Sequence, residues 1–449
     1  MTLVDMRRMR TAVESADTVC VQGHVVRAAG LILEARMPTA SVGDVCEVEA
    51  RGGRSILAQV VGVTAGSAML MPFTGLEGVR NGSPVRMHSD GDTVPVGDSL
   101  LGRVVDAELQ PLDDGPRPAR TSRRTLHGSV PGALARRRIS RTELLGIRVL
   151  DAFLTCGEGQ RVGIMAGPGV GKSVLLGMMA RHAEADVNVV ALVGERGREV
   201  KEFIERDLQA AGLARSVVVV ATSDSAPLLR VRAALAATAV AEHFRARGKR
   251  VLLIMDSLSR VAMAQREIGL AAGEPPTAKG YPPSVFALMP RLLERAGNDA
   301  GAGSITGFYT VLAEGDDLSD PVADSARSLL DGHIVLSRSL ANRGHFPAVD
   351  ILQSVSRVMP DVVSGEHLDL ARRVRDILAT YKDSADLVEV GAYQRGSNPR
   401  LDFALSVLDE LNAFCRQASA EKTPLEEALA RVRTLLAPRP APRPGGSRA

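Results

Sequence analysis

The feature that most constrains this chain is a glycine-rich segment that lies between two apolar stretches, 161–165 and 174–180. The first stretch is typical of a buried strand and the second of a buried helix. The segment between them reads Ala166-Gly167-Pro168-Gly169-Val170-Gly171-Lys172-Ser173. A strand, a glycine-rich turn and a helix form the context in which a phosphate-binding P-loop occurs. The pattern therefore predicts a P-loop, with a chance glycine-rich loop as the alternative.

Each part of the segment has a physical role in this prediction. Glycines let successive backbone N–H groups turn toward the phosphates, and the helix N-terminus adds its partial positive charge. We expect Lys172 to reach the β- and γ-phosphates of ATP and Ser173 to hold Mg²⁺ through its hydroxyl. Ala166 stands where the pattern has its first glycine, a position that tolerates a methyl group when φ is negative. The predicted nucleotide-binding residues of the loop are Gly167, Pro168, Gly169, Val170, Gly171, Lys172, Ser173 and Val174.

Composition limits the class of protein. A length of 449 residues suits two or three domains, and 45% hydrophobic with 24% charged residues is typical of a soluble globular protein. We expect no membrane-spanning helix and no secretion signal. The four cysteines form no C-x-x-C pair and are expected to be reduced thiols of a cytosolic protein. A net charge of +3 and 3% aromatic residues argue against a nucleic-acid partner.

The pattern changes along the chain and predicts five parts. Residues 1–18 form an amphipathic docking helix for a partner protein or an acidic membrane surface, or else a frayed terminal helix. Residues 19–90 show short alternating runs separated by glycines, which indicates a small β-barrel. Residues 91–360 are expected to form the α/β P-loop core, and residues 361–436 a helical domain. The segment 437–449 is rich in Pro and Gly and is predicted to be disordered.

The predicted core is a RecA-like, mostly parallel sheet with helices on both faces, and the nucleotide should bind at the carboxyl ends of the strands. The expected strands are 161–165, 187–193, 217–222, 251–255, 304–312 and 332–337. Ahead of them, the basic run Arg136-Arg137-Arg138 is expected to be a solvated linker face.

Two acidic residues at strand ends are candidates for the same site. Asp256 follows the apolar run 251–255, where a P-loop enzyme needs a carboxylate for Mg²⁺. Glu195 follows another strand and is expected to polarise the attacking water. Arg196 is expected to contact the phosphate or the acid. The alternatives are an acid that ends a strand by chance and a surface ion pair between Glu195 and Arg198.

Several longer strings resemble a known family. The segment 192–200, LVGERGREV, is similar to the catalytic-glutamate segment of the rotary ATPases. Six further strings resemble the branch that energises type III protein export: MDSLSR (255–260), AQREIG (264–269), GEPP (273–276), GYPPSVF (280–286), EGDD (314–317) and DGHIVLSR (331–338). Three strings favour the flagellar export ATPase over its injectisome counterpart: VAMAQR (261–266), GHFPAVD (344–350) and GAYQRGS (391–397).

The resemblance implies roles for individual residues. It makes Glu195 the glutamate that polarises water, and it places Arg196 and Arg260 near the phosphates and the acidic pair. It makes Arg357 an arginine finger that reaches the nucleotide of the neighbouring subunit. Phe346 stands where the family often has a tyrosine stacked on adenine, so the stacking surface is kept and the hydroxyl is lost. The alternatives are a core phenylalanine and a helix-capping arginine.

The resemblance also implies a function. The chain is expected to hydrolyse ATP with Mg²⁺ in a homo-oligomeric ring, expected to be a hexamer, that unfolds export substrates and releases them from chaperones. The implied location is the cytoplasm, at the inner face of the cytoplasmic membrane beside the export gate, with a stator protein on the N-terminal helix. Three alternatives stay open: a catalytic subunit of a rotary ATP synthase, a hexameric RNA translocase and a nucleotide-binding scaffold that does not hydrolyse.

Overall fold

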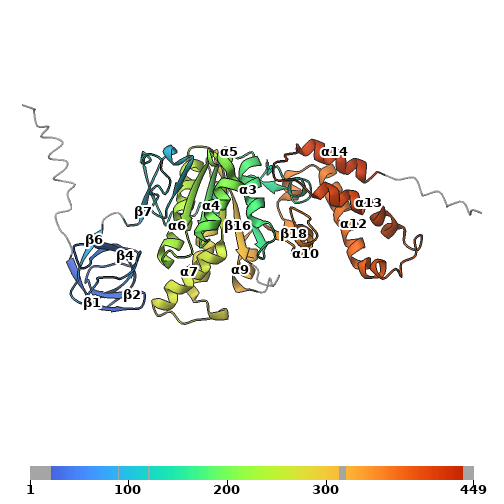
Figure 1. The fold of residues 1–449 in the computed structure, drawn as a ribbon. Helices are drawn as coiled ribbons and strands as arrows, with labels where there is room; N and C mark the ends of the chain where they lie inside the picture. The colour runs from blue at the N-terminus through green and yellow to red at the C-terminus, as the bar shows by residue number, and fades with distance from the viewer. Residues whose placement is uncertain (1–21, 89–90, 120–121, 313–319, 438–449) are drawn as a thin grey trace, which may run out of the picture.

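The computed structural model describes residues 22–88, 91–119, 122–312 and 320–437. A barrel, an α/β domain and a group of helices follow one another along an elongated molecule (Figure 1). This order confirms the predicted fold class, whereas the exact domain boundaries stay predictions. The expected docking helix at 1–18 lies outside the described residues, and so does the expected disordered tail apart from Ala437.

The barrel closes within residues 22–88. Its six strands pair in the order β1-β2-β5-β4-β3-β6, and every pairing is antiparallel. Alternate residues point inward, so Leu33, Val48 and Leu70 are fully buried in the barrel interior. The strands are β1 (Gln22–Ala29), β2 (Ile32–Arg36), β3 (Val45–Glu49), β4 (Ser55–Thr64), β5 (Ser67–Pro72) and β6 (Pro84–His88).

The central sheet of the described chain has eight strands, and all neighbours pair in parallel except β17 and β18. In spatial order they are β18 (Val349–Ser356), β17 (Gly332–Leu336), β12 (Arg161–Ala166), β16 (Ser304–Leu312), β15 (Arg250–Asp256), β13 (Val187–Val193), β14 (Ser216–Ala221) and β8 (Arg103–Val105). Two small sheets pair β7 (Thr93–Val96) with β9 (Ser122–Thr125) and β10 (Thr142–Glu143) with β11 (Cys156–Gly157).

All six predicted core strands are present, with ends that differ by at most one residue. The sequence pattern missed the two edge strands. β8 is a three-residue strand in a loop-rich region, and β18 is half exposed, so neither shows the long buried run of the inner strands. β18 pairs with β17 in the antiparallel direction, and the connection between them, residues 337–348, contains the helix α10.

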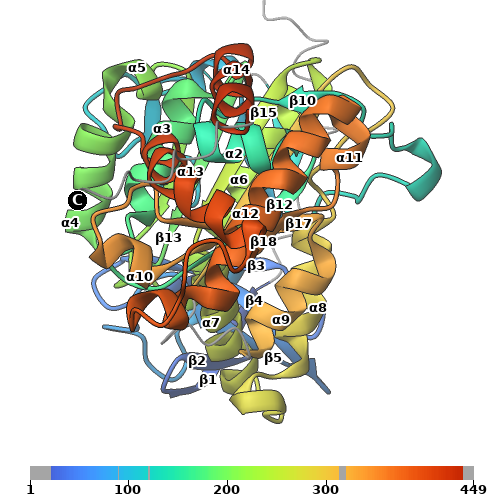
Figure 2. The same ribbon diagram turned by 90° about the vertical axis from the view of Figure 1, so that its right-hand side faces the viewer.

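Helices cover both faces of the sheet. Helices α6, α7, α8 and α9 share one apolar cluster with it, while α2, α3 and the C-terminal helices share the other. Figure 2 shows α3, α4 and α5 on one side of the molecule and α8 and α9 on the other. Among the described residues, no helix has the length and apolar character needed to cross a membrane. The α-helices are α2 (Arg148–Phe153), α3 (Lys172–His182), α4 (Gly197–Glu202), α5 (Gln209–Leu213), α6 (Pro227–Ala246), α7 (Leu258–Ala271), α8 (Pro283–Leu293), α9 (Pro321–Leu329), α10 (Arg338–Asn342), α11 (Met359–Val362), α12 (Gly365–Glu389), α13 (Pro399–Cys415) and α14 (Leu425–Leu435). The structure also has the short 3₁₀ helices η1 (Asp98–Leu100), η2 (Ala133–Ala135) and η4 (Ala278–Gly280), and the π-helix η3 (Phe203–Leu208) between α4 and α5.

The basic run at 136–138 is solvated in part, as we expected: Arg137 and Arg138 are exposed, whereas Arg136 is half-buried. Arg136 donates to the carbonyl of Ala296 at 2.9 Å, and Arg137 donates to the carbonyl of Gly303 at 3.0 Å. Arginine has five N–H donors in a fixed fork, so it can satisfy carbonyl groups that a loop leaves without partners. The sequence pattern did not predict these hydrogen bonds, because charge alone cannot show which carbonyl groups lie nearby.

A buried ion pair joins α6 to the end of α8. The guanidinium of Arg295 donates two hydrogen bonds of 2.8 Å to the carboxylate of Glu242, and it also donates to the carbonyl of Leu126. The two side chains are 2% and 10% exposed. Removing one partner would therefore leave a buried charge without compensation.

We predict that Arg295→Ala lowers the free energy of unfolding by about 3–5 kcal/mol, because Glu242 stays buried without its partner. The matched control is Arg400→Ala, whose pair with Asp376 is 70% and 62% exposed and which should cost about 0–1 kcal/mol. Urea unfolding monitored by circular dichroism measures both changes. Equal midpoints for the two variants would contradict the prediction.

Candidate active site

The P-loop connects the end of β12 to the start of α3, as predicted. Gly169 and Gly171 have φ values of 76° and 84°, a region that favours glycine. Ala166 is the last residue of β12, where extended backbone accommodates its methyl group. Lys172 is the first residue of α3, so its side chain and the helix N-terminus both face the loop.

Lys172 lies between two carboxylates. Its Nζ is 2.5 Å from Oδ1 of Asp256 and 3.3 Å from Oε1 of Glu195. Asp256 also accepts a hydrogen bond of 2.6 Å from the hydroxyl of Thr310. The three charged groups come from α3, from the end of β15 and from the residues after β13, so the parallel sheet brings them together at the carboxyl ends of its strands. The structure thus brings together the lysine and both acids that the sequence proposed.

The charges in this cluster shift one another's pKa. Burial alone would lower the pKa of Lys172, but the charges of Asp256 and Glu195 and their hydrogen bonds raise it above its usual value. For Glu195, burial raises the pKa most, and the Asp256 charge and a hydrogen bond with Glu199 add to it. Together they outweigh the opposing effect of Lys172, so the pKa of Glu195 is about 7. Without nucleotide, Glu195 is therefore poised to hold a proton near neutral pH.

Glu199 is a site residue that the sequence analysis quoted without a role. It lies in the first turn of α4, and its hydrogen bond with Glu195 lowers the pKa of Glu199. Its place in the first helical turn after Glu195 was the signal that could have found it. A small cavity of about 30 Å³ is lined by Ser173, Leu192, Glu195, Glu199, Val200, Phe203 and Asp256.

The oxygen-rich lining of this cavity fits Mg²⁺, which prefers carboxylate and hydroxyl ligands. Within the described part of the chain, no group of three or more His, Cys, Asp or Glu side chains is arranged to hold a metal alone. Both findings suit a cation that nucleotide enzymes hold by one or two protein oxygens together with the phosphates of the substrate. Ser173 and Asp256 are the residues that would hold it.

The other predicted residues lie at different distances from this cluster. The side chain of Arg196 is 82% exposed and pairs at 3.8 Å with Glu199, so it is not brought into the cluster. Arg260 packs against Gly194, just before Glu195, and its Nε is buried without a hydrogen-bond partner. Arg357 follows β18 and is exposed, with one hydrogen bond of 3.5 Å to the carbonyl of Arg327.

Phe346 lies beside the P-loop. A Cβ placed on Gly171 would be 3.1 Å from its ring, which itself is 43% exposed. The backbone N–H of Gln417, just after α13, donates to the carbonyl of Phe346 at 3.0 Å. A ring that is partly exposed beside the phosphate loop offers an apolar face for a base to stack on.

The loop that contains Gln417 is held firmly. The side chain of Gln417 accepts from the backbone N–H of Arg148 at 2.8 Å and donates to the carbonyl of Gly146 at 2.8 Å. Arg148, itself buried, donates to the carbonyl of Phe414 and the hydroxyl of Thr423. The C-terminal helical domain is thus attached to the element that carries Phe346.

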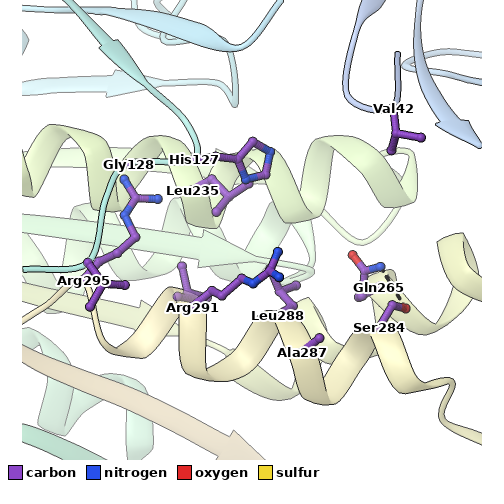
Figure 3. Close-up of a pocket in the computed structure, with 12 residues that line it drawn as sticks. Val42, His127, Gly128, Leu235, Gln265, Ser284, Ala287, Leu288, Arg291 and Arg295 are labelled. Atoms are coloured by element: carbon purple, nitrogen blue, oxygen red, sulfur yellow. Dashed lines mark hydrogen bonds between the residues drawn. The ribbon is translucent and has the colours of Figure 1, made fainter. Parts of the chain in front are cut away.

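A second cavity, of about 590 Å³, lies away from the P-loop (Figure 3). Leu235, Leu288 and Leu292 form its apolar wall, and Arg291 and His127 add polar groups. None of the residues that line it belongs to the cluster around Lys172. It is therefore separate from the candidate active site.

Three protein-family descriptions match the chain. Residues 146–356 match the nucleotide-binding domain of the ATP synthase alpha/beta family, and residues 25–88 match the β-barrel domain of the same family. Residues 363–434 match the T3SS EscN ATPase C-terminal domain. The three matches follow one another along the chain in the order barrel, nucleotide-binding domain and C-terminal helices.

Whole-chain relatives agree with these matches. The chain is 50% identical to a flagellum-specific ATP synthase of Bacillus subtilis, over 94% of this chain and 97% of that protein. It is 49% identical to a type 3 secretion system ATPase of Sinorhizobium fredii, over 92% of each. It also resembles the solved structure of the assembled ATPase EscN in complex with its central stalk EscO from enteropathogenic E. coli, with a TM-score of 0.86 and 42% identity over 92% of this chain and 100% of that one. The chain therefore belongs to the ATP synthase alpha/beta family, in its group of flagellar and type III secretion export ATPases.

Proposed function

We propose that this ATPase acts in flagellar-type protein export, where it unfolds substrates and releases them from chaperones at the membrane export gate. The observation that carries the enzymatic part is the cluster of Lys172, Asp256 and Glu195 at the end of a P-loop. The flagellar branch is supported by the strings at 261–266, 344–350 and 391–397. The corresponding injectisome ATPase is the second candidate, because relatives of both kinds match to a similar extent.

In the proposed reaction, Lys172 and the N–H groups of the P-loop hold the phosphates of ATP. Ser173 and Asp256 would hold Mg²⁺, which would supply positive charge beside the phosphates. The phosphates give Lys172 a new partner, so Asp256 is free to act as an oxygen ligand. Glu195 then orients and polarises the water that attacks the γ-phosphate.

Glu195 needs its charged form for that role. Without nucleotide, burial and the nearby carboxylates favour the protonated form. The guanidinium of Arg357 from a neighbouring copy would add positive charge close to Glu195, and positive charge lowers the pKa of a carboxyl group. The catalytic base would thus become competent only in the assembled, loaded site.

Arg357 is proposed to act in the neighbouring copy of a ring, with six copies the expected size. Its exposed position after β18 leaves the guanidinium available to a partner. An arginine supplied in this way stabilises charge on the transferring phosphoryl group and raises the rate by about 10³–10⁵-fold.

Three further residues have proposed roles. Arg260, next to Gly194, is proposed to support the segment that carries Glu195. Arg196 is proposed to turn toward the phosphates on nucleotide binding. Phe346 is proposed to stack on the base.

The partners follow from the relatives. The EscN structure holds a central stalk, and we propose a comparable stalk or stator partner for this chain, with the stator bound at residues 1–18. The C-terminal helices are proposed to face chaperones and unfolded substrates. The proposed location is the cytoplasmic face of the inner membrane.

We predict that Lys172→Ala abolishes ATP hydrolysis, because the phosphates lose their main cation and Asp256 loses its partner. Lys382→Ala is the matched control, since Lys382 is exposed on α12, away from the P-loop cluster. A phosphate-release assay measures both variants, and circular dichroism shows that they fold. Hydrolysis at the parental rate in Lys172→Ala would contradict the proposed site.

We predict that Arg357→Ala keeps nucleotide binding and loses hydrolysis by about 10³-fold or more. Arg372→Ala, on an exposed part of α12, is the control. Mixing Arg357→Ala with Glu195→Gln chains should restore part of the activity, because some interfaces then carry both intact groups. No recovery at any ratio, in rings shown to be mixed, would count against a shared site.

The pKa of Glu195 also predicts how stability depends on pH. A glutamate in the unfolded chain titrates near 4.5, and in the folded, nucleotide-free protein Glu195 titrates near 7. The folded state therefore holds the extra proton between these values, and the contribution of Glu195 to stability falls as pH rises through that window. As pH rises from 5 to 8, we expect the free energy of unfolding of Glu195→Gln to increase relative to that of the parent. Urea unfolding without nucleotide measures this difference. Identical pH profiles for the two proteins would contradict this assignment.

A further inference from the structure

The segment 128–138 carries an apolar side chain with nothing packed on it. Leu134, in the short turn η2, is completely exposed to water, and Val130 of the same segment is 43% exposed. Single exposed apolar residues are common on protein surfaces. What sets Leu134 apart is how firmly the chain around it is held.

Arginines anchor the segment to the nucleotide-binding domain. Arg136 donates to the carbonyl of Ala296 at 2.9 Å and to the carboxylate of Glu294 at 3.0 Å. Arg137 donates to the carbonyls of Ala302 and Gly303 at 3.1 and 3.0 Å. These contacts fix the segment on the turns that follow α8. The leucine is therefore presented by a fixed base.

The anchor also places the segment beside Arg357. Arg138 pairs at 3.1 Å with Asp361 of α11, the helix that begins two residues after Arg357. Figure 2 shows a teal segment that extends from the molecule next to α11, whereas α4 lies on the opposite side. Helix α4 carries Glu199 of the candidate active site. The segment that carries Leu134 and the helix α11 that follows Arg357 therefore lie on the side of the molecule opposite α4.

In a ring, every copy makes the same contact with the next one. Each contact therefore joins one face of a copy to a different face of its neighbour. If Arg357 completes the neighbour's site, then the side with Arg357 meets the neighbour's side with α4. The segment that carries Leu134 extends from that same side, toward the place where the neighbour would lie. Because its arginines are already paired within the chain, the segment offers the neighbour mainly an apolar contact.

We propose that segment 128–138 is a contact between copies of this chain, in which Leu134 packs on the neighbour's face that carries α4 and so holds Arg357 in position. This inference rests on the proposed function, because it takes the ring and the shared site as given. Burial of a leucine side chain that is otherwise in water favours association. The occupant of this surface is thus a second copy of the chain.

The test uses the full chain and three variants: Leu134→Asp, the conservative Leu134→Met, and the control Val390→Asp. Val390 is also an exposed apolar residue, at 76%. Sedimentation velocity over a range of concentrations, with Mg²⁺ and a non-hydrolysable ATP analogue, measures assembly. We expect Leu134→Asp to need at least about tenfold more protein to assemble. The two other variants should assemble like the parent, and all four chains should unfold at the same temperature.

A second readout separates assembly from chemistry. The ATPase activity per chain of Leu134→Asp should fall at low protein concentration and recover at high concentration. The isolated Leu134→Asp chain should bind a fluorescent ATP analogue as tightly as the isolated parent chain does. If the parent assembles and hydrolyses ATP and Leu134→Asp follows the same concentration dependence, this inference fails and the proposed function stands. If the parent hydrolyses ATP fully as a single chain, the shared site and this inference both fail.

Discussion

The active site depends on the buried ammonium group of Lys172, which lies between two carboxylates. A buried charge is tolerated only where opposite charge compensates it, and Asp256 at 2.5 Å supplies most of that compensation without nucleotide. In the proposed function, the phosphates of ATP would bring negative charge to the same place and compete with Asp256 for Lys172. Substrate binding would then be an exchange of partners. The exchange would leave Asp256 available to the metal and change the surroundings of Glu195.

The parallel sheet makes this exchange of partners possible. The C-terminal helices are connected to the same region through the loop after α13. Parallel strands bring Lys172, Glu195 and Asp256 to one edge although they are far apart in the chain. The loop after α13 lies near both ends of α3. At the start of α3, the N–H of Gln417 donates to the carbonyl of Phe346, which lies beside the P-loop. At the end of α3, Arg181 donates to the carbonyl of Ser419. The C-terminal region is therefore in contact with groups at both ends of α3, the helix that begins with Lys172.

Much of this arrangement could be predicted from the sequence because its signals are local. The P-loop, the inner strands and Asp256 are encoded in short runs whose physical meaning does not depend on distant residues. The edge strands β8 and β18 could not be predicted in this way, since half-exposed strands lack the buried apolar run. The hydrogen bonds of Arg136 and Arg137 could not be predicted, because the carbonyl groups that accept them belong to residues 296–303, far along the chain. The role of Glu199 was missed because it depends on a helix turning back toward Glu195.

The central claim is that the site is built from two copies, with the phosphate cradle in one and Arg357 in the other. The most direct test is a structure of the assembled ring with Mg²⁺ and a non-hydrolysable ATP analogue. The account predicts that Lys172 has left Asp256 for the phosphates and that the guanidinium of Arg357 from the adjacent copy lies at hydrogen-bonding distance, about 3 Å, from a γ-phosphate oxygen. An Arg357 that points away from the adjacent nucleotide in every copy, with Lys172 still paired to Asp256, would contradict it.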